Sequence, residues 1–217
     1  DKPALEGLEQ KWGTVWEDKG TYRFDREGAT RECIYSIDTP PPTASGSLHV
    51  GHVFSYTHTD TVARFQRMQG KRVFYPMGWD DNGLPTERRV QNYYGVRCDP
   101  SLPYIEDFVP PFTGGDNKGG KAAEQQPISR RNFIELCETL TEEDERQFEE
   151  LWRTLGLSVD WKQSYRTIGS DSIRASQLAF VRNAARGEAY QAMAPTLWDV
   201  TFRTAVAQAE QRVDVGR

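Results

Sequence analysis

The sequence is poor in cysteine and has no long apolar run. Its cysteines, Cys33, Cys98 and Cys137, are odd in number and never spaced as C-x-x-C, which argues against a disulfide scaffold and a zinc knuckle. No apolar stretch has the length that crosses a bilayer, and no signal peptide precedes the first expected element. These absences predict a protein of the reducing cytoplasm with no membrane partner.

Glycine-rich phosphate-binding motifs are missing as well. No G-x-G-x-x-G is present, which argues against an ordinary dinucleotide-binding dehydrogenase. The run Gly119-Gly-Lys121 lacks the spacing and the preceding strand of a Walker motif. The net charge is −5, so no general excess of positive charge indicates a nucleic-acid partner, although a local patch could hold RNA.

Apolar residues are scarce for a chain of this length. Of the 217 residues 37% are hydrophobic, and the mean hydropathy is −0.72. Both values are low for a domain that must bury its own core, which indicates a part of something larger. The first residue is Asp1 rather than Met, and we therefore expect translation to start upstream.

The first half of the chain has the pattern of a βαβ unit. We expect a strand at residues 30–38, a stop at Pro40-Pro-Pro42, a helix over residues 47–69 that ends at Gly70, and a strand at residues 72–77. A strand, a helix and a strand in this order predict an α/β fold with a parallel pair and a right-handed crossover.

The remaining elements are expected to be mostly helical. A first helix begins near Leu5 and stops at Gly20, and Ser129 caps a helix that ends at Thr139. Thr141 then begins a separate helix, with the acidic residues 142–145 in its first turn. We also expect a helix at residues 88–94 and a loop at residues 99–127. The second of the two helices should carry a core-facing stripe of Phe148, Leu151, Trp152 and Leu155 and end at Gly156.

The last part of the chain is expected to hold one more helix and extended structure. The helix should run from Ser170 or Ser172 to Gly187, with Ile173, Leu178, Val181 and Ala185 in the interior. Residues 190–207 are expected to be extended, with Trp198, Val200, Phe202 and Val206 alternating.

Two histidines stand at the start of the helix that follows the prolines. His49 and His52 are three residues apart and share one face of its first turn, where free N–H groups and the helix dipole favour anions. Gly51 between them allows a phosphate or a flat ring to approach the backbone. This predicts a nucleotide triphosphate site; the alternative is a pair of ordinary histidines. His58 lies about 240° further round the helix, so a three-histidine metal site is not expected.

The same residues carry a resemblance to a known family. His49-Val-Gly-His52 resembles the HIGH motif of class I aminoacyl-tRNA synthetases, and its proline-rich context is most similar to the valyl members of the valine, isoleucine and leucine subgroup. Three further stretches are similar to that subgroup: residues 78–87, 155–161 with Tyr165, and 204–210. The resemblance covers nearly the whole chain.

The resemblance implies a fold and a division into domains. The fold is a partial Rossmann-like (HUP-type) parallel sheet, its first βαβ half, with a helical connective insertion. Residues 1–98 would hold the N-terminal helix and the first half of the nucleotide-binding fold, and residues 99–127 a loop or linker. Residues 128–217 would begin the connective insertion that leads to an editing domain.

It also implies an activity and its residues. The family activates an amino acid with Mg²⁺-bound ATP and passes it to tRNA, here valine and tRNA-Val. His49 and His52 would be catalytic, and Thr43, Gly46, His49, Gly51 and His52 would bind ATP. Asp80 can pair with the ammonium group of the amino acid, or alternatively cap a helix. Pro41 and Pro42 offer a rigid apolar wall, or simply end the strand. Trp79 is expected to serve packing rather than contact.

Several family features are absent. Residues 198–203 have no cysteine, so no structural zinc is expected. The KMSKS loop, the editing domain, the second half of the nucleotide-binding fold and the anticodon-binding helices are missing, and the remainder of such a chain is an expected partner. The isolated 217 residues are expected to be inactive or very weak. An isoleucyl or leucyl relative, and a truncated paralogue acting as a binding module, remain alternatives, because physics alone does not select valine.

Overall fold

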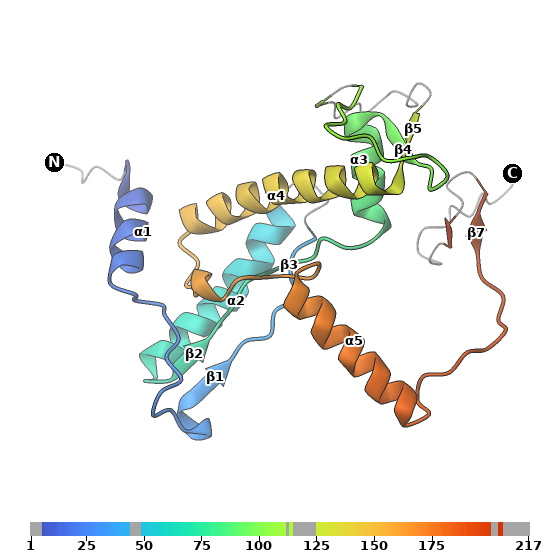
Figure 1. Cartoon of the computed structure of the whole chain (residues 1–217). Coiled ribbons are helices and arrows are strands. Elements are labelled where there is room, and N and C mark those ends of the chain that lie inside the picture. The colour runs from blue at the N-terminus through green and yellow to red at the C-terminus, as the bar shows by residue number, and fades with distance from the viewer. Residues whose placement is uncertain (1–5, 44–48, 112, 115–124, 201–203, 206–217) are drawn as a thin grey trace, which may run out of the picture. The chain divides into compact units, whose positions relative to one another are not determined.

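The computed structural model describes residues 6–43, 49–111, 113–114, 125–200 and 204–205. The chain separates into two compact units, residues 1–173 and 174–217, and each is considered by itself. The first unit is an α/β assembly of short parallel strands and helices (Figure 1). The α/β class predicted from the sequence is confirmed.

The expected N-terminal helix is present as α1 (Leu8–Asp18). Gly20 follows it with φ of 59°, a left-handed conformation that glycine adopts at little cost, so the predicted stop is confirmed. Leu5, the first residue of the predicted apolar pattern, lies outside the described residues.

The predicted βαβ unit is confirmed in its centre and shorter at its edges. The strands β1 (Ile34–Ser36) and β2 (Arg72–Phe74) pair in parallel with Tyr35 opposite Val73, and α2 (Val50–Met68) connects them. The start of the expected first strand is instead the 3-10 turn η1 (Arg31–Cys33).

Two further parallel pairs were not predicted from the sequence. The strand β3 (Gly78–Trp79) pairs with β6 (Tyr165–Arg166), and β4 (Val96–Cys98) pairs with β5 (Gln126–Ile128). Each of these strands has only two or three residues, which is too short to show a periodic pattern. The helix α3 (Leu84–Tyr94) lies between β3 and β4 and begins four residues before the expected helix at 88–94.

The predicted pair of helices after Ser129 is wrong. One continuous helix, α4 (Arg130–Thr154), runs through Thr141, whose buried hydroxyl donates to the carbonyls of Cys137 and Glu138 instead of capping a new helix. Neither glycine nor proline interrupts this stretch. Ser129 caps α4 as predicted, since its Oγ accepts from the Asn132 N–H, and Gly156 follows the helix with φ of 71°.

The core of the first unit is formed where α4 crosses α2 (Figure 1). Trp152 of α4 is fully buried and its ring centroid lies 4.9 Å from that of Tyr56 on α2. Trp79 is also buried there, which confirms that it serves packing, whereas Leu155 is 42% exposed and does not belong to the predicted stripe. A second cluster surrounds α3 and comprises Val90, Tyr94, Val96, Ile128, Phe133 and Leu140.

The C-terminal helix has the predicted bounds but not the predicted burial. The helix α5 (Ser170–Ala185) is followed by Gly187 with φ of 75°, yet Ile173, Leu178 and Val181 are exposed, so their assignment to an interior is wrong; Ala185 is exposed as well. Beyond it, β7 (Trp198–Asp199) pairs antiparallel with β8 (Thr204–Ala205). Phe202 and Val206 lie outside the described residues. In the part of the chain that is described, no helix is long and apolar enough to cross a membrane.

Candidate functional site

The His-Val-Gly-His segment is folded onto itself at the start of α2. His49 is the N-cap of the helix, and its Nδ1 accepts from the Gly51 N–H at 3.1 Å. The Nδ1 of His52 faces the His49 N–H at a longer 3.4 Å. In a neutral imidazole one nitrogen accepts and the other donates. Both Nε2–H groups are therefore the donors that remain for a ligand.

The two rings lie against each other at the edge of the core. Their centroids are 4.0 Å apart, and the ring of His52 packs edge-on against Phe148 at 5.8 Å. His49 is exposed and His52 is half-buried. Burial lowers the pKa of His52, and the neighbouring His49 lowers it further. His52 is thus neutral at neutral pH and would reach an anion by hydrogen bonding rather than by charge.

The space beside Gly51 is not open. A Cβ at this position would lie 3.0 Å from both Cε1 and Nδ1 of His49, closer than side chains normally approach. The sequence pattern predicts that Gly51 leaves room for an approaching nucleotide. In the structure the imidazole of His49 itself occupies that space.

The proline segment runs between α2 and β3. The Tyr56 hydroxyl of α2 donates to the Pro40 carbonyl at 2.7 Å, and the Asp80 N–H donates to the Pro42 carbonyl at 2.9 Å. Thr43 and Asp80 form an isolated parallel bridge. The predicted convergence of the two strand ends is thereby confirmed for Pro42, Thr43 and Asp80.

The two groups of candidate residues are joined by a segment outside the described part of the chain. Residues 44–48 connect Thr43 to His49, and Gly46 and Ser47 fall within them. Pro42 is buried, Pro41 and Asp80 are half-buried, and Thr43 is exposed. Pro42 is therefore bound to Asp80 through the backbone, and an apolar wall formed by Pro41 and Pro42 stays a prediction.

The alternative role of Asp80 or Asp81 as a helix cap is wrong. The N-cap of α3 is Gly83, which has φ of 100° and carries no side chain to accept a hydrogen bond. Asp80 and Asp81 precede it, outside the helix. Their side chains are accordingly available for other partners.

Asp81 belongs to an ionic cluster that the sequence analysis missed. Its side chain is fully buried, and Arg166 Nε of β6 lies 3.9 Å from its Oδ2. The same Nε lies 2.7 Å from Glu145 Oε1 of α4. Burial raises the pKa of Asp81. It also raises the pKa of Glu145 to about 7, and the charge of Asp81 adds to this shift.

Tyr165 of β6 covers the glycine before this loop. A Cβ on Gly78 would overlap the Tyr165 ring, so only glycine fits beneath it. The ring is 39% exposed. Partial burial raises the pKa of its hydroxyl, and the charges of Asp38 and Asp80 act in the same direction.

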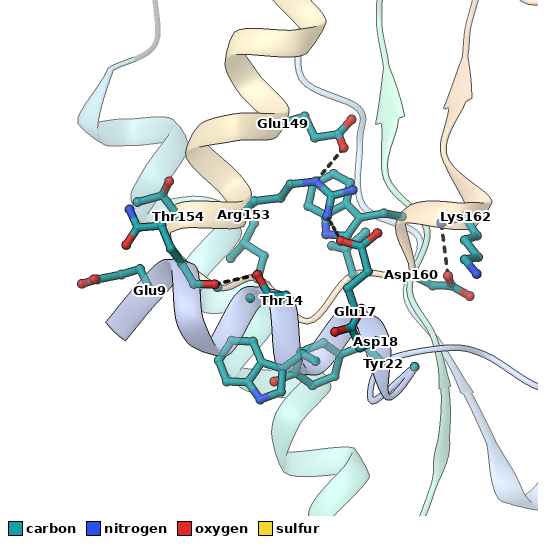
Figure 2. Close-up of a pocket in the computed structure, with 18 of the residues that line it drawn as sticks. Glu9, Thr14, Glu17, Asp18, Tyr22, Glu149, Arg153, Thr154, Asp160 and Lys162 are labelled. Atoms are coloured by element: carbon teal, nitrogen blue, oxygen red, sulfur yellow. Dashed lines mark hydrogen bonds and ion pairs between the residues drawn. The ribbon is translucent and has the colours of Figure 1, made fainter. Parts of the chain in front are cut away.

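A cavity lies away from these residues. It has a volume of about 850 Å³, lies between α1 and the C-terminal part of α4, and is lined by none of the candidate residues. Figure 2 shows Arg153 on this cavity between Glu149 and Glu17, at Nε–Oε1 and Nη1–Oε2 distances of 2.7 and 2.9 Å. Arg153 is thus paired with two carboxylates, and its guanidinium is not free to bind an anionic ligand. In the described part of the chain, no group of three potential ligand side chains could hold a metal ion.

Comparison with known proteins places the chain in one family. The model of the class I tRNA synthetases (I, L, M and V) matches residues 11–101 and 116–215. A valine–tRNA ligase of Leifsonia xyli subsp. xyli is 78% identical over 213 residues, and one of Thermobifida fusca is 71% identical over 210 residues. Each alignment covers 97% of this chain but only 25% and 23% of those proteins. The chain thus spans about a quarter of the length of these relatives.

A solved structure shows the same fold. It is the ternary complex of Agrobacterium radiobacter K84 agnB2 LeuRS with tRNA and LeuAMS, which superposes with a TM-score of 0.65 at 21% identity. The match covers 92% of this chain and 20% of that one. The chain belongs to the class I tRNA synthetase family.

Proposed function

We propose that this chain is the N-terminal part of a valine–tRNA ligase. The 78% identity to a valine–tRNA ligase over 213 residues carries this proposal. The whole enzyme would join the valine carboxylate to the α-phosphate of ATP, release pyrophosphate and form valyl-adenylate. It would then transfer the valyl group to the terminal ribose of tRNA-Val.

The candidate site supports the first step with two sets of groups. We assign the Nε2–H donors of His49 and His52 to phosphate oxygens, which gain charge as pyrophosphate leaves. Thr43, Gly46 and Gly51 complete the proposed ATP site. Mg²⁺ would enter with ATP, bound through its phosphates rather than by a dedicated protein site.

The amino-acid side of the site is formed by the proline segment and Asp80. The Asp80 carboxylate would pair with the ammonium group of valine, and Pro41 and Pro42 would contact its branched side chain. The hydrogen bond from the Asp80 N–H to the Pro42 carbonyl supports this assignment, because it holds the two halves of the proposed pocket together.

The domain division proposed with this function follows the sequence analysis. Residues 1–98 form the N-terminal helix and the first half of a Rossmann-like nucleotide-binding fold, 99–127 a connecting loop, and 128–217 the start of the connective insertion. The editing domain, the KMSKS-bearing half and the anticodon-binding domain of the full enzyme would be partners of this chain. No zinc site is proposed within it.

The proposal is tested by amino-acid-dependent exchange of pyrophosphate into ATP in the full-length protein. We expect exchange with valine, and far less with isoleucine or leucine. His52→Ala should lower the exchange rate by about 100-fold while changing the Kd for valine less than about threefold, since its hydrogen bond strengthens as phosphate charge develops. Thr139→Ala, on the exposed side of α4, is the control and should leave both values unchanged.

Two outcomes would contradict the proposal. Absence of valine-dependent exchange in the full-length protein would favour a binding module, and preference for isoleucine or leucine would favour the corresponding relative. For the isolated 217 residues we expect at most very weak exchange.

A further inference from the structure

A short segment that follows α4 holds the backbone around Asp80. The Tyr165 N–H donates to the Met77 carbonyl at 3.1 Å, and the Thr167 N–H donates to the Trp79 carbonyl at 3.0 Å. These bonds extend the parallel pairing of β3 and β6 up to the residue before Asp80. The loop that presents Asp80 therefore begins on a fixed strand.

The peptide groups on both sides of Asp80 are also fixed. Its own N–H donates to the Pro42 carbonyl at 2.9 Å. The next N–H, that of Asp81, donates to the Thr167 side chain, with an N–Oγ1 distance of 3.0 Å. Both backbone donors that flank the Asp80 Cα are thus bound, one by the proline segment and the other by a threonine hydroxyl.

The side chains of Asp80 and Asp81 have different environments. Asp81 is fully buried beside Arg166 and Glu145, whereas Asp80 is half-buried. Neighbouring residues of an extended segment point to opposite faces. Because the Asp81 side chain is buried on one side of the chain, the Asp80 carboxylate is left on the more exposed side, at a residue whose backbone is paired with Thr43.

From this geometry we propose that Thr167 is a positioning residue for substrate binding. It acts through the Asp81 N–H to hold the Asp80 carboxylate where the ammonium group of the amino acid binds. The inference rests on the proposed function, because it requires Asp80 to be the ammonium partner. Thr167 itself need not contact the substrate.

The test compares variants of the full-length enzyme in the exchange assay, each with KM values for valine and for ATP. Thr167→Val keeps the shape of the side chain but leaves the Asp81 N–H without its acceptor, and we expect KM for valine to rise about tenfold. KM for ATP should stay within about twofold, because the hydrogen bond from the Asp81 N–H to Thr167 involves none of the proposed ATP residues. Thr167→Ser retains an acceptor and should restore KM for valine to within about threefold of the unmodified enzyme.

Controls separate positioning from general destabilisation. Thr139→Val removes a comparable hydroxyl, which donates to the Glu135 carbonyl on the exposed side of α4, and should leave both KM values unchanged. In an Asp80→Asn background, Thr167→Val should add less than about twofold to the KM for valine, because the two residues act through one contact. If Thr167→Val fails to fold, Thr167→Ala and Thr167→Ser provide the same comparison.

The inference and the proposed function fail in different ways. If the unmodified enzyme shows no valine-dependent exchange, the proposed function is wrong. If exchange is present but Thr167→Val leaves KM for valine unchanged, or raises both KM values equally, the positioning role is wrong. An effect of Thr167→Val that persists undiminished in Asp80→Asn would also overturn it.

Discussion

At the scale of single residues, the histidine pair is organised by its own backbone. Each Nδ1 faces an N–H of the same four-residue segment, so the rings are oriented before any ligand arrives. Pre-orientation matters because a donor that need not reorganise stabilises developing charge most effectively. Protonation of the His52 Nδ1 would remove one of these acceptors. Because the pKa of His52 is lowered, its ring stays neutral at neutral pH and both acceptors are kept.

Gly51 offers a direct test of this arrangement. Gly51→Ala should change the unfolding free energy by less than about 1 kcal/mol, because alanine favours a helix by about that amount while the His49 ring must move. Displacing that ring should nevertheless lower pyrophosphate exchange in the full-length protein about tenfold. Urea unfolding and the exchange assay measure the two effects.

The control for this substitution is Gly13→Ala in α1. A Cβ at Gly13 would meet nothing within 4 Å, so alanine should stabilise the helix without affecting exchange. If Gly51→Ala left the exchange rate unchanged, the orientation of His49 would not matter for activity.

The histidines were predictable from the sequence, whereas Thr167 was not. His49 and His52 stand in a local pattern of strand, prolines and helix that a reader of the sequence can recognise. Thr167 reaches Asp81 across 86 positions, and its role exists only after β3 and β6 have paired. The pair Asp80 and Asp81 did contain a hint, since alternation in an extended segment allows only one of them to face a ligand.

At the scale of elements, α4 is the main difference from expectation. The acidic residues 142–145 were assigned to the first turn of a helix, but they lie in the middle of one. There three of them bind to other elements: Asp144 accepts from Arg89 of α3 at 2.7 and 2.6 Å, and Glu142 and Glu145 pair with Arg166 of β6. Local charge patterns cannot reveal such tertiary partners, and a helix-dipole role was the wrong explanation.

Glu145 should make the stability of this chain depend on pH. Asp81, Arg166 and, through Arg166, Glu142 are the charged groups around it, and its pKa is raised to about 7. In the unfolded chain this carboxyl group has its ordinary, lower pKa and releases its proton at lower pH. Between the two pKa values the folded state therefore holds more protons than the unfolded state, and its stability falls as pH rises. Because the glutamine amide cannot ionise, the Glu145→Gln variant should gain about 1 kcal/mol of unfolding free energy relative to the unmodified chain as the pH rises from about 5 to about 8.

Urea unfolding at several pH values measures this difference, with Glu143→Gln as the matched control on the same helix. Arg146 holds the pKa of Glu143 at about 2, so that residue stays ionised throughout and its variant should show no such trend. A Glu145→Gln difference that is constant with pH would contradict the raised pKa of Glu145.

At the scale of the whole molecule, one face of α2 is apolar and uncovered in the described part of the chain. Its side chains recur at intervals of three, four or eight residues, so they fall on one side of the helix. These residues, with their exposed fractions, are Val50 (81%), Phe54 (64%), Val62 (43%), Phe65 (55%) and Met68 (82%). His58 lies in the same row, with its ring 4.3 Å from that of Phe54. An exposed apolar patch of this kind is typical of a surface that another part of a protein covers.

If this chain is the N-terminal quarter of a valine–tRNA ligase, the remainder of that enzyme should cover this face. Phe54→Cys should react with a maleimide readily in the 217-residue chain and at least about tenfold more slowly in the full-length protein, because burial excludes the reagent. Thr139→Cys is the control: it is exposed on α4, its neighbours one turn away are Glu135 and Glu143, and its rate should be similar in both proteins. Peptide mapping separates these sites from the native cysteines. Equal labelling of Phe54→Cys in both proteins would mean that the apolar face of α2 stays exposed and that the catalytic fold is completed elsewhere.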